Sequence, residues 1–298
     1  MSHHHHHHQH PAPQSINGVL VFSIVLNLAF VFLEALIGLW VNSMSLLSDA
    51  GHNLSDVFSL ILVMVAFRLS KVQRSRKYTY GYKKSTVLIS LVNAVILLVA
   101  VGVIIMESIH KFESPAEING AAVSWTAGAG IIINGLTVIL LMKGQKNDLN
   151  VRGAFLHMVA DTLVSVGVLA SGIVISYTGW YLIDPILSIV IALVILLSTW
   201  SLLTKSVRLS LDGTPYNVDI DQVEKLLNDD EHVKEVHHIH VWAISTTENA
   251  MTAHVVIDRL EYMEEVKHRL KHRLEEAGIA HSTLEMETSG CHCHAKDC

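Results

Sequence analysis

Six apolar stretches alternate with short polar segments over the first two thirds of the chain. Each is about 20 residues long or longer, and a helix of that length crosses a hydrocarbon core about 30 Å thick. The pattern therefore predicts six membrane-spanning helices. We expect them near residues 17–40, 44–68, 85–109, 121–142, 151–177 and 181–204.

The pattern changes after residues 212–215, whose sequence Asp-Gly-Thr-Pro is typical of a turn. Beyond this point, short segments either alternate apolar and polar residues, as half-buried strands do, or repeat apolar residues with a helical period. The order helix, strand, strand, helix, strand predicts a small α+β domain. The helices are expected at residues 219–229 and 261–278, and the strands at 233–245, 250–258 and 279–287.

Composition supports a helical membrane protein with a soluble extension. The 298 residues are 51% hydrophobic and 16% charged, and the mean hydropathy is +0.42. Residues 1–212 carry 13 Lys and Arg against 10 Asp and Glu, whereas residues 213–298 carry 8 against 17. No basic cluster with interleaved aromatic residues indicates nucleic-acid binding. We expect a His-rich tail at 1–16, a membrane domain at 17–212, a metal-binding soluble domain at 213–288 and a Cys/His-rich tail at 289–298.

Lysine and arginine residues predict the orientation of the spans, because cytoplasmic loops carry an excess of both. The loop after the second span, the loop after the fourth span and the end of the sixth span are all basic, whereas the opposite loops hold only Lys111. The basic loops are therefore expected in the cytoplasm, with both chain termini on the same side.

Two of the predicted spans contain a His followed four residues later by an Asp. His52 and Asp56 lie in the second span, and His157 and Asp161 lie in the fifth. Residues at i and i+4 share one face of a helix, so each span can direct an imidazole and a carboxylate to one point. Two such helices would offer two nitrogen and two oxygen ligands, which suits tetrahedral Zn²⁺. The alternative is two unrelated polar pairs that hydrogen-bond neighbouring helices.

The predicted topology places both pairs at the same depth. His52 follows the outer start of the second span, near Ser43, by nine residues, and His157 follows the inner start of the fifth, near Asp148, by nine. A rise of 1.5 Å per residue brings each imidazole about 13 Å into a core about 30 Å thick. The two helices run antiparallel, so the pairs can share one ion near the middle. Ionisable groups at this depth are costly and mostly functional, which favours the metal site.

Both ends of the chain are rich in metal-binding residues. The N-terminal run from His3 to His8 is either an affinity tag or a native metal-collecting segment, and His10, which continues the run, favours the second. The C-terminal cluster is typical of soft-metal binding rather than of a disulfide framework. It contains Cys291, His292, Cys293, His294 and Cys298.

Six motifs contain or accompany the His–Asp pairs: residues 48–56 (SDAGHNLSD), 80–82 (YGY), 107–112 (ESIHKF), 150–157 (NVRGAFLH), 184–186 (DPI) and 236–242 (VHHIHVW). With these motifs the sequence resembles the cation diffusion facilitator family, in particular its bacterial zinc-exporting branch, from about residue 18 to 287. The resemblance implies a homodimer in the bacterial inner membrane, with six spans and a metallochaperone-like cytoplasmic domain in each protomer. It also implies Zn²⁺ efflux driven by proton entry.

The resemblance assigns roles to residues that match the family's motifs. It implies that the transported ion binds the two His–Asp pairs, and that regulatory metals bind the strands of the cytoplasmic domain. The expected regulatory ligands are His237, His254 and His281, with Glu287, Cys291 and Cys293 as further ligands. An alternative for the three histidines is that they are surface residues of the strands. The basic loop from 68 to 84 contains no Asp or His, so we expect no metal site there.

A charge contact is expected where the membrane domain meets the soluble domain. The family places a Lys and an Asp there, and the matching residues are Lys84, which opens the third span, and Asp212, which follows the sixth. The resemblance implies that this pair locks the dimer. The alternative is that Lys84 only follows the preference of cytoplasmic loops for positive charge.

The predicted function is export of divalent cations in exchange for protons, with Zn²⁺ as the main substrate and Cd²⁺, Co²⁺ or Ni²⁺ as further candidates. Neutral imidazole and ionised carboxylate bind metal, so protons and metal compete for the same ligands, as an antiporter requires. One alternative is an intramembrane zinc hydrolase, but that would need an open water position and a general base, and no HExxH stretch occurs. Another is a passive channel or a metal sensor. We expect no enzyme, and as partners a second copy of the chain, membrane lipid and protons.

Overall fold

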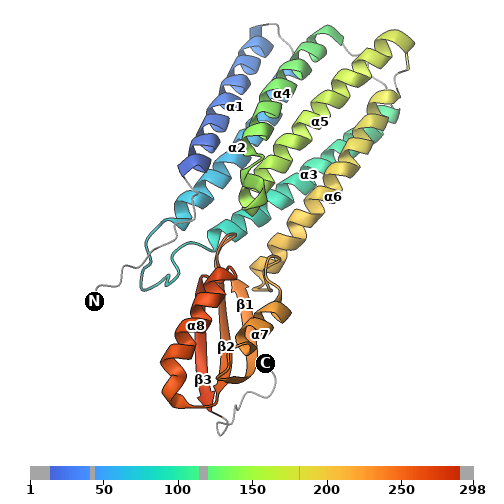
Figure 1. Ribbon diagram of the computed structural model, residues 1–298. Helices are drawn as coiled ribbons and strands as arrows, with labels where there is room; N and C mark the ends of the chain where they lie inside the picture. The colour runs from blue at the N-terminus through green and yellow to red at the C-terminus, as the bar shows by residue number, and fades with distance from the viewer. Residues whose placement is uncertain (1–13, 41–43, 114–119, 181, 289–298) are drawn as a thin grey trace. The chain divides into compact units, whose positions relative to one another are not determined.

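The computed structural model describes residues 14–40, 44–113, 120–180 and 182–288 of the chain (Figure 1). Six long helices come first. They are α1 Gln14–Trp40, α2 Met44–Ser70, α3 Ser85–Glu113, α4 Gly120–Leu141, α5 Leu149–Thr178 and α6 Ile183–Ser210, with a short 3₁₀ helix η1 at Gly144–Lys146. Each long helix lies over a predicted span, so helices form where the apolar pattern predicts them.

Three of these helices are long and apolar enough to cross a membrane within the part of the chain that the structure describes. The segments are Gly18–Ile37 in α1, Ser85–His110 in α3 and Pro185–Ser210 in α6. The apolar segment of α4 is shorter, Ala127–Leu141. α2 and α5 carry the two His–Asp pairs and other polar residues, which lower their hydropathy. Three spans are clear by length and composition, and the count of six stays a prediction.

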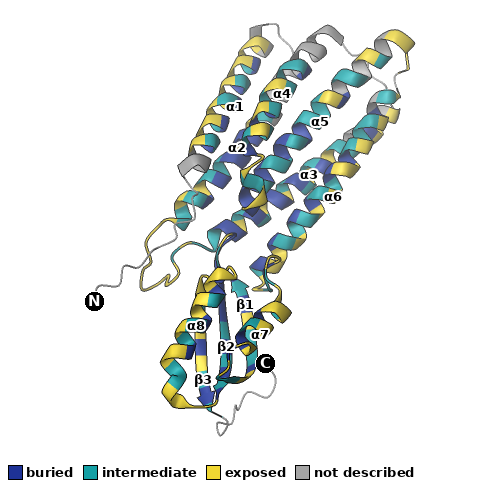
Figure 2. Ribbon diagram, viewed as in Figure 1, coloured by how far each residue is buried: buried dark blue, intermediate teal, exposed yellow. Residues whose placement is uncertain are grey.

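Exposed and buried residues both occur along the long helices (Figure 2). Many of the exposed residues are apolar: Phe32, Val99, Ile132 and Leu197 are 62–76% exposed. Several polar side chains are buried instead: Asn27, Glu34, Asp56, Asn93, Asn134 and His157. Water would oppose this distribution, whereas lipid favours it, because lipid solvates apolar surface and excludes unpaired polar groups. The distribution indicates a membrane protein.

The chain divides into two compact units, and several boundaries between them fall inside the long helices. The first consists of Met1–Val65, Val101–Lys146 and Ala154–Ile195, and the second of Ala66–Ala100, Asn147–Gly153 and Leu196–Cys298. Within the first unit, Asn27 Nδ2 donates to Thr137 Oγ1 over 3.1 Å, which joins α1 to α4. Such bonds hold helices together where lipid competes equally well for apolar contacts. The domain boundaries expected from the sequence stay a prediction.

The described residues after α6 form a three-stranded sheet with two α-helices (Figure 1). The elements are α7 Ile220–Asn228, β1 Val233–Ala243, β2 Asn249–Ile257, the short 3₁₀ helix η2 Leu260–Tyr262, α8 Met263–Glu276 and β3 His281–Thr288. The sheet order is β1-β2-β3, with β1 and β2 antiparallel and β2 and β3 parallel. This arrangement confirms the predicted α+β domain and its αββαβ order. We call it the C-terminal domain.

One face of the sheet packs against α7 and α8. The side chains of α8 in this core are Val266, Leu270 and Leu274, which recur every four residues and are fully buried. After α8 ends, Gly278 adopts a φ of +85°, and the amide of Ile279 donates to the carbonyl of Leu274 over 2.9 Å. Glycine suits this position because a side chain would strain the left-handed conformation.

An ion pair holds the loop between α7 and β1 on α8. Arg269 Nε donates to Asp230 Oδ2 and Arg269 Nη2 donates to Asp230 Oδ1, both over 2.9 Å, and the Asp230 side chain is 2% exposed. The hydrogen bonds from Arg269 lower the pKa of Asp230. Burial opposes this shift, and the amide of His232 adds to it.

The turn between β1 and β2 contacts helix ends of the same unit. Thr246 Oγ1 donates to Asp148 Oδ2 over 2.6 Å, and the Thr246 amide donates to Thr86 Oγ1 over 3.1 Å. Asp148 also caps α5, because its Oδ1 accepts hydrogen bonds from the amides of Asn150 and Val151. Asp148 and Thr246 are 4% and 8% exposed, so the turn and the two helix starts form a buried polar cluster.

Candidate metal centres

Three of the four residues predicted to bind the transported ion lie together in the first unit. Asp56 lies on α2, and His157 and Asp161 lie one turn apart on α5. His157 Nε2 is 2.7 Å from Asp56 Oδ1 and 4.0 Å from Asp161 Oδ2. One ligand atom from each residue lies within 4.8 Å of the others. Small side-chain rotations therefore suffice to bring all three to one ion.

These three side chains are buried, where charge is costly. Asp56, His157 and Asp161 are 1%, 4% and 9% exposed. Oδ2 of Asp56 is buried as well, and no described residue donates a hydrogen bond to it. A buried carboxylate oxygen without a donor needs another source of stabilisation, and a bound cation is one. An imidazole with two carboxylates is a ligand set that suits Zn²⁺.

The fourth predicted ligand is His52. Its backbone belongs to α2, four residues before Asp56. Its side chain lies outside what the structure describes, so its role as a ligand stays a prediction.

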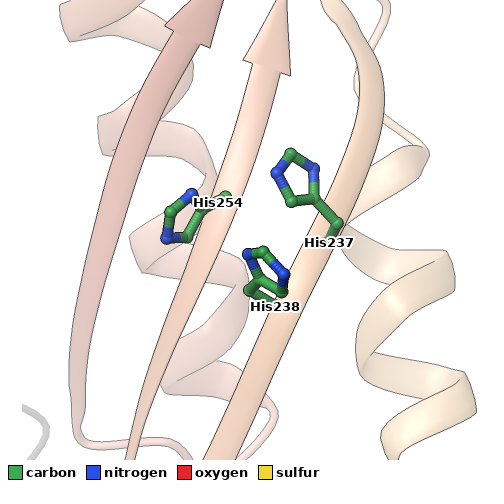
Figure 3. A group of neighbouring side chains, drawn as sticks. All are labelled: His237, His238 and His254. Atoms are coloured by element: carbon green, nitrogen blue, oxygen red, sulfur yellow. The ribbon is translucent and has the colours of Figure 1, made fainter. Parts of the chain in front are cut away.

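A second group of potential ligands lies on the face of the sheet opposite α7 and α8. His237 and His238 are consecutive residues of β1, and His254 is a residue of β2 (Figure 3). The three ring centroids are 4.9, 5.1 and 5.2 Å apart, and one ring nitrogen from each lies within 4.8 Å of the others. Two strands therefore bring three imidazoles to one place.

Two carboxylates of β3 extend this group. His254 Nδ1 is 2.5 Å from Glu287 Oε1, and His254 Nε2 is 3.4 Å from Glu285 Oε2. Glu287 Oε2 is also 3.7 Å from His237 Nε2, and Glu287 is 9% exposed. The parallel pairing of β2 with β3 produces this arrangement, because it sets Glu285 opposite His254. Oxygen ligands are thus available beside the imidazoles.

The structure does not bring His281 into either group. His281 lies on β3 as expected, but its register partner on β2 is Ala250, four residues before His254. That separation is about 13 Å along a strand. The exposed His281 ring instead packs edge to face against Tyr80, with centroids 5.8 Å apart. The geometry therefore gives no support to a shared site with His281. The two other expected ligands, Cys291 and Cys293, lie outside the described residues.

Neither His238 nor Glu285 was expected from the sequence as a metal ligand. Val236 and Ile239 both pack in the core, although strict alternation would place them on opposite faces. A β-bulge after His237 resolves the conflict by directing two consecutive residues outward. The spacing of the two apolar residues in Val-His-His-Ile was the available signal for His238. Alternation along β3 puts Glu285 on the same face as His281 and Glu287, but its partner on β2 depends on the strand register, which one strand does not reveal.

The structure places the predicted charge pair in contact within the second unit. Lys84 Nζ is 2.5 Å from Asp212 Oδ1, and it also donates to the carbonyls of Leu209 and Ala243 over 2.9 and 3.1 Å. The side chains of Lys84 and Asp212 are 37% and 65% exposed. The role of this pair in a dimer stays a prediction.

Two family models together match almost the whole chain. Residues 20–209 match the cation efflux transmembrane domain, and residues 215–289 match the cytoplasmic domain of cation efflux proteins. The chain belongs to the cation efflux family. The resemblance read from the motifs is thereby confirmed, and so is the assignment of this cation efflux protein to a membrane.

Curated relatives of this cation efflux protein cover most of its length. The cadmium, cobalt and zinc/H(+)-K(+) antiporter of Bacillus subtilis is 34% identical over 91% of this chain and 88% of its own. Zinc transporter ZitB of Escherichia coli is 34% identical over 93% of this chain and 90% of its own. Metal cation efflux system protein CzcD of Cupriavidus metallidurans is 33% identical, with coverages of 95% and 90%. All three names describe transport of metal cations and none describes an enzyme.

Proposed function

We propose that this protein is a membrane transporter that exports Zn²⁺ from the cytoplasm in exchange for protons. The observation that carries the proposal is the buried group of Asp56, His157 and Asp161, on two helices of a cation efflux domain. Relatives named as a zinc transporter and as a cation/proton antiporter support the substrate and the exchange. Cadmium and cobalt appear in one of these names, so Cd²⁺ and Co²⁺ are further candidate substrates, as is Ni²⁺.

The exchange follows from competition for the same ligands. Zn²⁺ is the cargo, and it binds an unprotonated imidazole and ionised carboxylates. A proton that reaches His157 or either carboxylate removes a ligand, so proton entry from outside favours release of the metal there. His52 completes the tetrahedral set in this proposal. The site faces the two sides of the membrane in turn, and it never carries both ions at once.

The proposed setting is a homodimer in the bacterial inner membrane, with six spans per protomer and both termini in the cytoplasm. The family model for the C-terminal domain is named for a dimer, and the basic loops support the orientation. The membrane domain is proposed to end at residue 212 and the metallochaperone-like cytoplasmic domain to end at residue 288. We propose no catalytic activity.

The C-terminal domain is proposed to bind regulatory metal ions. His237, His254 and Glu287 supply the ligands that the structure brings together. Metal bound there would link three strands of the sheet, stiffen the domain and favour the transport-competent dimer when the metal is abundant. Lys84 and Asp212 would hold the start of α3 and the end of α6 in this state.

The test is Zn²⁺ flux into sealed liposomes that contain the purified protein, followed with a zinc-sensitive dye and a pH-sensitive dye inside. Zn²⁺ uptake should require an acidic interior, raise the interior pH and stop when a protonophore collapses the gradient. Asp56→Asn and Asp161→Asn should abolish flux. Thr137→Val removes the bond between α1 and α4 and the bond from Thr137 to the carbonyl of Ile133, both away from the proposed site, and should keep flux.

Other outcomes distinguish the alternatives. Zn²⁺ uptake that is indifferent to the pH gradient would indicate a channel. Near-normal flux in either Asp variant would refute the proposed site. Parallel runs with Cd²⁺, Co²⁺ and Ni²⁺ define the selectivity.

A further inference from the structure

One residue of β1 has an unusual backbone conformation. His238 has a φ of +51°, a left-handed value that few residues other than glycine adopt. The strand pairing with β2 is interrupted at this point, between His237 and His240. Strained conformations of this kind persist only where the surrounding structure holds them, and bulges often re-aim a side chain toward a site.

The bulge moves the His238 ring from one face of the sheet to the other. With strict alternation, a residue after the outward-facing His237 would point into the apolar core beside α7 and α8, where an imidazole would lack hydrogen-bond partners. The observed conformation instead sets the His238 ring 4.9 Å from that of His237 and 5.1 Å from that of His254 (Figure 3).

The ring of His237 provides a second, independent observation. Both of its nitrogens are buried, and no described residue forms a hydrogen bond with either. The nearest carboxylate oxygen, Glu287 Oε2, is 3.7 Å from Nε2, which is beyond hydrogen-bond range. A buried polar atom without a partner calls for a reason, and metal coordination is one that fits neighbouring imidazoles.

We propose that His238 is a metal ligand, and that the bulge completes a site formed by the imidazoles of His237, His238 and His254 with Glu287 as the fourth ligand. Bonds of about 2.0–2.1 Å in a tetrahedral site set ligand atoms about 3.3 Å apart. The three ring nitrogens lie within 4.8 Å of one another, so side-chain rotation closes the difference. Three nitrogens and one oxygen favour Zn²⁺ or Co²⁺ over Mg²⁺ and Ca²⁺, which prefer oxygen ligands.

This inference deepens the proposed function and rests on it only for the consequence that metal at this site regulates transport. Binding itself is tested without transport, on the full-length protein in detergent. Diethyl pyrocarbonate modifies accessible imidazoles, and mass spectrometry reads the modification residue by residue during a Zn²⁺ titration. Zn²⁺ should protect His238 together with His254, over one concentration range, and should leave the exposed His240 reactive.

A matched pair of variants gives the second readout. His238→Gly removes the imidazole at a position whose φ glycine adopts without strain, and His240→Ala removes a neighbouring imidazole that belongs to neither group. The loss of a direct ligand is expected to cost at least as much as the 10–100-fold typical of outer-shell partners. The Zn²⁺ midpoint for protection of His254 should therefore rise at least about tenfold in His238→Gly and stay unchanged in His240→Ala.

The two readouts also separate ligation from a purely structural role. Without metal, His238→Gly should be as stable as the unmodified protein, since the substitution removes strain. An unchanged protection midpoint in His238→Gly, or protection of His254 that leaves His238 reactive, would overturn the inference. Either result can occur while liposomes still show proton-driven Zn²⁺ flux, so the inference can fail while the proposed function stands. If Zn²⁺ protects His238 and His254 but liposomes show no flux, the proposed transport function fails and the inference stands.

Discussion

The contacts of Lys84 allow a quantitative prediction about the end of α6. Its ammonium group donates to two backbone carbonyls, those of Leu209 and Ala243, as well as to the carboxylate of Asp212. Lys84→Met removes all three hydrogen bonds but keeps an unbranched side chain of similar length. Asp212→Asn removes only the ion pair, and asparagine tolerates the φ of +56° at this position.

The two variants should differ strongly in effect. The ion pair is solvent-accessible on both sides, so its loss in Asp212→Asn should cost at most about 1 kcal/mol. Each carbonyl bond adds about 1 kcal/mol, which brings the cost of Lys84→Met to about 3 kcal/mol. Because about 1.4 kcal/mol corresponds to a factor of ten, local opening should increase about fivefold in Asp212→Asn and about 150-fold in Lys84→Met.

Hydrogen exchange of the full-length protein measures this opening. The amide of Gly213 donates to the carbonyl of Arg208 over 2.8 Å, and it becomes exchangeable when the end of α6 separates from Lys84. Mass spectrometry of the peptide that contains Gly213 should show the two accelerations. Lys77→Met is the matched control, since the Lys77 ammonium lies 5.8 Å from the Tyr78 ring, outside these contacts, and should leave exchange within about twofold of the original.

The result that would refute this reasoning is equal acceleration in the two variants. It would mean that the ion pair, and not the carbonyl bonds, holds the end of α6. A larger effect of Asp212→Asn would mean that the pair is less accessible to solvent than the structure shows.

Three further predictions concern the C-terminal domain. Leu270→Ala should destabilise it by about 2–5 kcal/mol in thermal or denaturant unfolding, whereas Leu260→Ala, at a side chain that is 63% exposed, should change little. Asp230→Asn should lower the free energy of unfolding at pH 7, and this loss should shrink below about pH 4. The reason is that a carboxyl whose pKa is lowered by folding stabilises the folded state only while it is ionised. A loss that stays constant down to about pH 3 would contradict this. Thr246→Val removes one hydrogen-bond donor from the buried carboxylate of Asp148. Hydrogen exchange of the amides in the first turn of α5 should therefore accelerate by a factor equivalent to about 1–3 kcal/mol. Zinc stimulation of transport should weaken, while metal binding by the sheet should persist.

Much of the fold was predictable because local pattern determines it. Apolar runs of sufficient length predicted α1 to α6, and alternation followed by helical periodicity predicted the αββαβ order. Pairs of ligands within one helix were predictable for the same reason. His157 and Asp161 share a face of α5 because they are four residues apart. The proximity of Asp56 to His157 also followed, since equal depth on antiparallel helices needed only a residue count and the direction of each span.

The sheet site was less predictable because it depends on register and on one irregularity. His281 shares a face of β3 with Glu287, as counting suggests, but the parallel register sets Glu285 beside His254. That register depends on the length of α8 and its connections, which no strand pattern contains. His238 was missed because strict alternation would place it in the core. The bulge that turns it outward leaves no trace in the sequence pattern of the neighbouring strand.

Connectivity along the chain suggests how the two metal groups can influence each other. Thr246 lies in the turn that joins β1, which carries His237 and His238, to β2, which carries His254. Its hydroxyl binds the carboxylate that caps α5, and His157 follows that cap by nine residues of the same helix. An ion that fixes β1 to β2 therefore fixes both ends of the turn on which the start of α5 depends. A metal ion bound to the sheet can shift the transport equilibrium only by the difference between its binding free energies for two positions of that turn. In the proposed function, the hydrogen bond from Thr246 to Asp148 is thus the contact at which metal binding by the sheet and transport can be separated.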